Sequence, residues 1–292
     1  MHEKITKEPI DESTKEPNKE PARETPGESN TPDIDLQGGE AGVLLIHGLT
    51  GSPFELKYLA RKLHKAGFSV KVPLLAGHAS TLRQLRATTW QDWYVSALKA
   101  FDELCRNHSR VFVSGLCMGA VLALYLAYER QEKVSGISLM STTLYFDGWS
   151  APWYRHLLPI AFHTPIRHFF SYKERPPYGI KNESFRNRVL QLMEEKSIAY
   201  SSVPFKSMYE LQKLNDNVKT LLHHVKTPTL ILHSVEDDMA SLRSVRFIER
   251  HIASKSLRTI LLNDCYHMLT IDNQRDVVEK ETIDFFNEHK QT

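Results

Sequence analysis

The chain has 292 residues, of which 41% are apolar, 25% charged and 10% aromatic, a composition typical of a soluble globular protein. No apolar stretch approaches the roughly 18 residues of a membrane-spanning helix, so no membrane span is expected. The net charge of +2 indicates no nucleic-acid partner. Three cysteines cannot form a disulfide framework, so a reducing, cytoplasmic compartment is expected.

The first 37 residues differ from the rest of the chain. Residues 1–37 contain five basic and ten acidic residues, so this segment carries a charge of −5 and the remainder carries +7. Lys-Glu-Pro occurs three times in it, and strong hydrophobes are sparse. Such a segment cannot bury enough apolar surface to offset its chain entropy. We therefore predict a disordered acidic tail, which is either a solvating extension or an interaction arm.

After the tail, short aliphatic runs typical of buried strands alternate with segments of helical periodicity. The expected strands are residues 42–46, 69–72, 111–114, 134–140, 229–233 and 259–262, and the expected helices are residues 53–65, 89–105, 120–127 and 276–287. Strands that alternate with helices pair in parallel and are covered on both faces. The sequence therefore predicts an α/β protein whose core is formed by residues 38–142 and 219–292.

Residues 143–218 interrupt this alternation. Residues 143–180 hold ten of the chain's 28 aromatic residues and five prolines, which exclude one long helix. We expect short helices that form a cap over the carboxyl edge of the sheet, where aromatic rings would suit an apolar ligand. The alternative is that the rings only pack the insert onto the body.

Cys117 lies in a tight turn between an expected strand and an expected helix. The stretch Val111-Phe-Val-Ser-Gly-Leu-Cys-Met-Gly-Ala places Gly115 and Gly119 two residues to either side of it. The apex residue of such a turn is strained, and side chains at the flanking positions would collide. This is the nucleophile-elbow pattern with cysteine in the place of serine. We therefore predict that Cys117 is a nucleophile rather than an inert core residue.

A second turn, His47-Gly-Leu-Thr-Gly-Ser-Pro, follows the first strand of the alternating region. In hydrolases with a nucleophile elbow, such a turn donates one backbone N–H to the developing oxyanion, and the residue after the nucleophile donates the other. The predicted oxyanion donors are therefore the backbone N–H groups of Leu49 and Met118.

Two later strands end in titratable residues. One runs into Glu236, Asp237 and Asp238, and the last runs into His267. Nucleophile, acid and histidine is the chain order of the α/β-hydrolase triad. We predict His267 as the base and Asp237 as the acid that orients it, with Asp238 and Glu236 as reserves. No metal and no cofactor are expected, since adjacent histidines elsewhere lack a metal-ligand spacing.

Together these motifs resemble the α/β-hydrolases of the bacterial carboxylesterase and monoacylglycerol-lipase type, a capped, serine-aminopeptidase-like branch. Gly115-Leu-Cys-Met-Gly is similar to the Gly-Leu-Ser-Met-Gly elbow of that family, and His233-Ser-Val-Glu-Asp-Asp is similar to its acid loop, with the acid at Asp237. The resemblance implies an α/β-hydrolase fold with a mostly parallel sheet flanked by helices and a helical cap insert. It also implies hydrolysis of carboxylic esters with an apolar part through an acyl-enzyme.

The cysteine at the elbow leaves three functions open. The leading hypothesis is an esterase or lipase-like hydrolase that acts on a small apolar ester with a triad of Cys117, Asp237 and His267. The second is an acyltransferase or thioesterase that takes an acyl-thioester, as polyhydroxyalkanoate synthases do with a cysteine elbow, because a thioester intermediate is readily captured by amines and thiols. Dienelactone hydrolases also use such a cysteine but lack this insert. The third is a catalytically silent protein that binds a small apolar ligand.

Overall fold

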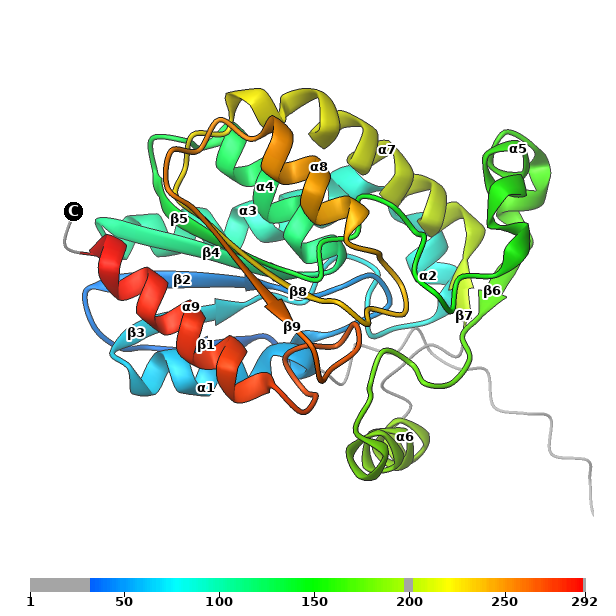
Figure 1. Ribbon diagram of the computed structural model, residues 1–292, viewed down its shortest axis with the longest axis horizontal. Coiled ribbons are helices and arrows are strands. Elements are labelled where there is room, and N and C mark those ends of the chain that lie inside the picture. The colour runs from blue at the N-terminus through cyan, green and yellow to red at the C-terminus, as the bar shows by residue number, and fades with distance from the viewer. Residues whose placement is uncertain (1–31, 197–201, 291–292) are drawn as a thin grey trace, which may run out of the picture.

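The computed structural model describes residues 32–196 and 202–290. Seven of the described strands form one sheet in the order β1-β3-β2-β4-β5-β8-β9 (Figure 1). Neighbouring strands are parallel except β1 and β3, which are antiparallel, so the predicted mostly parallel sheet is confirmed. The strands are β1 (Ile34–Leu36), β2 (Ala41–Ile46), β3 (Phe68–Val72), β4 (Arg110–Leu116), β5 (Val134–Met140), β8 (Thr229–Ser234) and β9 (Leu257–Leu262).

The register of the central strands brings their ends into line. The last residue of β2, Ile46, pairs with Gly115 of β4. The last residues of β4 and β5 pair with each other, as do the last residues of β8 and β9. Because these strands all run in one direction, the loops that follow them meet at the carboxyl edge of the sheet. Those loops contain the three predicted triad residues Cys117, Asp237 and His267.

Helices cover both faces of the sheet (Figure 1). One face is covered by α1 (Lys57–Lys65) and α9 (Arg275–Lys290), and the other by α3 (Trp90–Asn107), α4 (Met118–Glu129) and α8 (Arg243–His251). A buried apolar cluster fills each of the two layers. α4 buries residues around most of its circumference, because α7 (Phe205–Leu221) packs on its outer side. No helix within residues 32–196 and 202–290 is long and apolar enough to cross a membrane.

The prediction of a disordered tail is wrong for the last residues of that segment. β1 pairs with β3, and Ile34 and Leu36 pack against the apolar cluster on the α1 face. The carboxylate of Asp35 binds Lys71 at 2.5 Å. The stability of so short a strand depends on its partner strand β3. The composition of residues 1–37 does not show that such a partner exists. Residues 1–31 of the predicted tail lie outside the described residues.

The sequence pattern does not predict three helical elements of the body: α2 (Leu82–Ala87), α8 and η4 (Leu222–His224). The short helix η1 (Pro53–Leu56) falls within the expected helix of residues 53–65. α2 begins at a capping box, in which Thr81 and Gln84 bond each other's backbone N–H groups.

Between β5 and β8 the chain leaves the sheet. As the prolines predict, only short helical pieces form first: η2 (Trp153–Leu157), α5 (Leu158–Phe162) and η3 (Pro165–His168). Strands β6 (Ser171–Lys173) and β7 (Ser202–Pro204) form a small antiparallel sheet that the sequence does not predict. α6 (Glu183–Lys196) contributes Phe185 and Val189 to a small apolar cluster with Tyr58 and Ile271 of the body. α7 returns across α4 (Figure 1). The expected boundary at residue 218 falls within α7, and the division into core and cap stays a prediction.

Candidate active site

Cys117 occupies the turn between β4 and α4. Its φ of 57° and ψ of −116° lie outside the regions that side-chain-bearing residues ordinarily adopt. A Cβ atom on Gly115 would lie 2.1 Å from the backbone of Gly119, and one on Gly119 would lie 2.0 Å from the carbonyl oxygen of Ile46. Both positions therefore accept only glycine, and the backbone holds Cys117 in a strained elbow.

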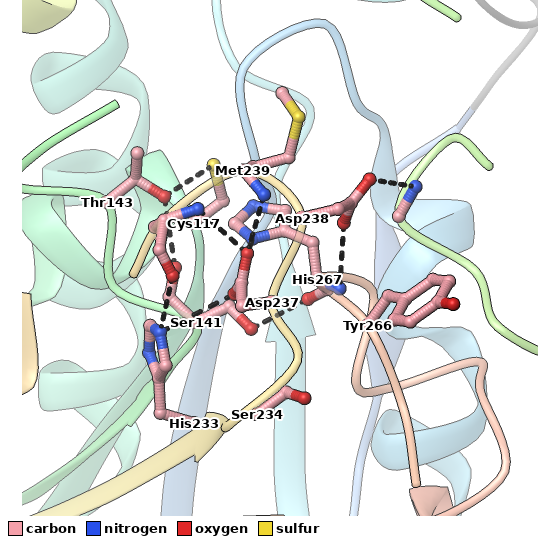
Figure 2. A network of polar contacts seen from close by, with 12 residues as sticks. Cys117, Ser141, Thr143, His233, Ser234, Asp237, Asp238, Met239, Tyr266 and His267 are labelled. Carbon is pink, nitrogen blue, oxygen red and sulfur yellow. Dashed lines mark hydrogen bonds and ion pairs between the residues drawn. The ribbon is translucent and has the colours of Figure 1, made fainter. Parts of the chain in front are cut away.

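The thiol of Cys117 meets the loop that follows β5 (Figure 2). Its Sγ lies 3.3 Å from Oγ1 of Thr143, whose hydroxyl donates to the carbonyl oxygen of Ser141 at 3.1 Å. Because that hydroxyl proton is already engaged, the thiol is the donor to Thr143. Ser141 in turn donates from its Oγ to the carbonyl oxygen of His267 at 2.7 Å. Neither Thr143 nor Ser141 is predicted from the sequence, although their position directly after a buried strand is a usable signal.

His267 and Asp237 form a buried pair in the same place (Figure 2). Nδ1 of His267 lies 2.9 Å from both carboxylate oxygens of Asp237, and each residue is only 4% exposed. Burial opposes ionisation of both groups, but the attraction between them lowers the pKa of Asp237. The same attraction raises the pKa of His267 well above its ordinary value, and Cys117 raises it further. Nε2 of His267 is buried and makes no well-formed hydrogen bond among the described residues, while the thiol of Cys117 acts on the same ring.

The acid loop holds the Asp237 carboxylate from its other side. Oδ1 accepts the N–H groups of Met239 and Ala240, both at 2.8 Å. Nε2 of His233 lies 3.6 Å from Oδ2 but donates to the carbonyl oxygen of Ala240 at 2.8 Å. Burial lowers the pKa of His233, so its ring stays neutral. Of the two histidines beside Asp237, only His267 therefore becomes the cation that the carboxylate stabilises.

The two reserve acids lie elsewhere. Glu236 pairs with Lys181 of the insert. Asp238 accepts the backbone N–H of His267 at 3.3 Å on one oxygen and that of Gly179 at 3.2 Å on the other. Asp238 therefore bonds the backbone of the histidine loop and of the insert, whereas Asp237 bonds the imidazole.

Two glycines of the insert bond the acid and histidine loops. Near the start of the insert, the N–H of Gly148 donates to the carbonyl oxygen of Met239 at 2.9 Å. Near its middle, Gly179 donates to Asp238 and its carbonyl oxygen accepts the N–H of Met268 at 2.8 Å. Gly179 has a φ of +73°, and a Cβ atom there would lie 2.9 Å from the Met268 side chain. The insert thus packs against the residues next to the acid and the histidine.

The predicted oxyanion donors lie in the turns next to Cys117. Met118 is the first residue of α4, and Leu49 follows β2 in the neighbouring turn. A Cβ atom on Gly48 would lie 3.3 Å from Cβ of Cys117, so the two turns are in contact. No acceptor for the N–H of Leu49 or Met118 is found among the described residues. The two donors are therefore available to a developing oxyanion beside the sulfur.

His47 fixes the turn that carries Leu49. Its Nδ1 donates to the carbonyl oxygen of Gly48 at 2.9 Å, and its Nε2 accepts the N–H of Leu75 at 3.2 Å. Burial lowers the pKa of His47 well below its ordinary value, which keeps the ring neutral as these two bonds require.

The thiols of the other two cysteines take no part in this arrangement, and that of Cys265 faces Gln274 rather than the triad. Cys265 is fully buried, and burial raises the pKa of its thiol to about 12. Cys105 lies in α3, where burial also raises its pKa. Both therefore stay protonated near neutral pH, which makes them poor nucleophiles.

The family model described as serine aminopeptidase, S33 matches residues 39–274 of the chain. The thermostable monoacylglycerol lipase of Bacillus sp. (strain H-257) is 28% identical over 253 residues, which span 87% of this chain and 93% of that protein. The carboxylesterase of Bacillus subtilis (strain 168) is 22% identical over 86% of this chain and 94% of its own. A solved structure from work on LipS and LipT, two metagenome-derived lipolytic enzymes, has a TM-score of 0.78 and 26% identity, and covers 89% of this chain and 98% of that one.

Proposed function

Since the chain belongs to the serine aminopeptidase S33 family and is a hydrolase of the lipase and esterase type, we propose that it cleaves carboxylic esters of apolar acyl groups with Cys117, His267 and Asp237. The predicted α/β-hydrolase fold is confirmed by the same likeness. The observation that carries the proposal is the His267 ring, whose Nδ1 bonds Asp237 while its buried Nε2 makes no well-formed hydrogen bond among the described residues.

Acylation begins when Nε2 of His267 takes the thiol proton of Cys117 and the sulfur attacks the ester carbonyl carbon. The N–H groups of Leu49 and Met118 bind the oxyanion that forms, and Asp237 stabilises the imidazolium. The C–O bond to the alcohol then breaks, and the leaving oxygen takes the proton from Nε2. The products of this half-reaction are the free alcohol and a thioester on Cys117.

Deacylation repeats these steps with water. His267 takes a proton from the water molecule, whose oxygen attacks the thioester carbonyl, and the same two N–H groups bind the second oxyanion. The C–S bond breaks, the carboxylic acid leaves, and the proton on Nε2 returns to the sulfur.

Partly exposed apolar side chains next to the reacting groups support an apolar acyl group. They are Leu49 in the oxyanion turn, Met239 in the acid loop and Met268 beside the histidine. Such side chains favour a hydrocarbon over a hydrated polar chain. We further propose a cytoplasmic setting, because all three cysteines are free and a thiol nucleophile must stay reduced.

Intact-mass analysis after mixing with a short-chain chromogenic ester tests the proposal. The wild type should gain one acyl group, Cys117→Ala should gain none and lose turnover with unchanged thermal unfolding, and the control Cys105→Ala should behave like the wild type. Undiminished turnover by Cys117→Ala would reject the proposed nucleophile. An adduct that an amine or alcohol discharges faster than water would identify acyl transfer instead of hydrolysis.

A further inference from the structure

Two carboxyl groups outside the triad flank the oxyanion turn. Glu55, in η1, accepts a hydrogen bond from the N–H of Gly48 at 3.2 Å. Glu174, which follows β6 in the insert, lies with Oε1 3.5 Å from Oγ1 of Thr50, whose hydroxyl also donates to the carbonyl oxygen of Leu49 at 2.5 Å. Leu49 lies between Gly48 and Thr50 in the chain. The predicted oxyanion donor is therefore bracketed by two residues that each contact a carboxyl group.

These two carboxyl groups have no lysine or arginine partner. Among residues 32–196 and 202–290, no ion pair joins a basic side chain to Glu55 or Glu174. The positively charged group that acts on both is the His267 imidazolium. Burial raises the pKa of Glu55 and of Glu174 to about 7. Glu55 and Glu174 are nevertheless half-buried residues rather than fully buried ones.

The buried Nε2 of His267 indicates which half of the substrate lies beside these carboxyl groups. This nitrogen makes no well-formed hydrogen bond among the described residues, and the residue is 4% exposed. In the proposed reaction Nε2 delivers its proton to the departing alcohol. The histidine loop lies against the short helix that carries Glu55, because the hydroxyl of Thr270 donates to the carbonyl oxygen of Glu55 at 2.7 Å. The departing alcohol therefore lies on the side of the site that holds Glu55, with Glu174 at the same oxyanion turn.

Negative charge at these positions works against the chemistry of the site. Two ionised carboxylates beside the oxyanion turn repel the charge that develops on the carbonyl oxygen. A hydroxyl group on the alcohol can bond a carboxylate but leaves that charge in place. An ammonium group bonds the carboxylates and also neutralises them, so it removes the repulsion in the transition state.

We propose that this site selects esters whose alcohol carries an ammonium group, with Glu55 and Glu174 as the anionic partners of that cation. The inference rests on the proposed ester hydrolysis by the same site. It gives Glu55 and Glu174, which take no part in the triad, a function in substrate recognition.

A pair of esters of equal shape and different charge tests the selection. Butyrylcholine is compared with its carbon isostere, in which tert-butyl replaces trimethylammonium, above the pKa of both carboxyl groups. We expect kcat/KM to favour the cationic ester by about 10- to 100-fold, because trimethylammonium has no N–H to donate and is attracted to the two carboxylates by charge alone. Glu174→Gln and Glu55→Gln keep the side-chain shape and should each reduce this ratio, whereas Glu183→Gln, at an exposed position of α6, should leave it unchanged.

Binding of the same two esters to Cys117→Ala separates this inference from the proposed reaction, because calorimetry needs no turnover. If the wild type hydrolyses neither ester but Cys117→Ala binds the cationic one more tightly, ester hydrolysis fails and the cation preference stands. A ratio near one or below in both measurements overturns the inference. A preference that survives both Glu55→Gln and Glu174→Gln overturns it as well.

Discussion

Replacing Asp237 by asparagine should place the imidazole proton of His267 on the wrong nitrogen. Oδ1 of Asp237 is held by the N–H groups of Met239 and Ala240, both at 2.8 Å, so the asparagine oxygen takes that position. The amide NH2 takes the place of Oδ2, so one of the two oxygens that lie 2.9 Å from Nδ1 of His267 becomes a hydrogen-bond donor. In the tautomer whose Nδ1 accepts from this NH2, the ring proton is on Nε2, and Nε2 can no longer take the thiol proton of Cys117.

The same substitution also removes the charge that stabilises the imidazolium. Asp237 raises the pKa of His267 well above its ordinary value, against the effect of burial, so burial dominates once the charge is gone. The wrong tautomer and the lost charge together remove about 4 to 5 kcal/mol of transition-state stabilisation, which corresponds to a loss of roughly a thousand- to ten-thousandfold in kcat.

Turnover of a chromogenic short-chain ester by Asp237→Asn measures this loss, and thermal unfolding checks that the fold is intact. Asp238→Asn is the matched control, since it removes the same charge one residue later, from a carboxylate that bonds only the backbone of His267 and Gly179. Loss of one such hydrogen bond predicts about a tenfold decrease. Equal losses in the two variants, or more than about a tenth of wild-type kcat in Asp237→Asn, would refute the tautomer argument.

Gly119→Ala should lower the free energy of unfolding by more than about 3 kcal/mol, because its Cβ would lie 2.0 Å from a carbonyl oxygen of β2. Gly67→Ala, with a φ of +89° and open space around the new Cβ, should lose only about 1 kcal/mol, and urea denaturation of both variants checks the contrast. Glu55 keeps its proton in the folded state up to about pH 7 but loses it near its ordinary pKa when unfolded, so wild-type stability falls as pH rises through that interval. Glu55→Gln should therefore gain on the order of 1–3 kcal/mol over the wild type above that interval and nothing in acid, and an equal difference at both pH values would contradict the assignment. Iodoacetamide should label Cys117 in the folded protein and Cys265 only after unfolding, and peptide mass spectrometry that finds Cys265 labelled first would contradict the burial argument.

The parts of the site that the sequence predicts are those set by local steric rules and by strand order. Gly115 and Gly119 are separated by a turn whose geometry depends on a few neighbouring residues, so their spacing identifies Cys117 without knowledge of the fold. The order of strands and helices then implies that the loops carrying Asp237 and His267 reach the same edge. Among three adjacent acids, however, the sequence offers only a resemblance for choosing Asp237, whereas the structure shows which carboxylate reaches the imidazole.

The parts that the sequence does not predict depend on contacts between distant segments. Thr143 reaches Cys117 from the loop after another strand, and Glu174 reaches Thr50 from the insert, 124 positions along the chain. Glu174 has no local pattern that distinguishes it from a surface residue, and the only local signal for Thr143 is its position after a buried strand. The strand β1 is missed for the same reason, since its partner β3 and not its composition stabilises it. The expected aromatic lining of the insert stays a prediction.

The hydrogen bonds from Gly148 and Gly179 to the acid and histidine loops determine at which positions the insert can be exchanged between related enzymes. A chimaera joined at the ends of β5 and β8 would replace partners of both loops, so it should lose kcat whatever insert it received. A chimaera joined inside residues 151–177 would keep those bonds and change only this first part of the insert. The part of the insert that can be exchanged is therefore shorter than the whole segment between β5 and β8.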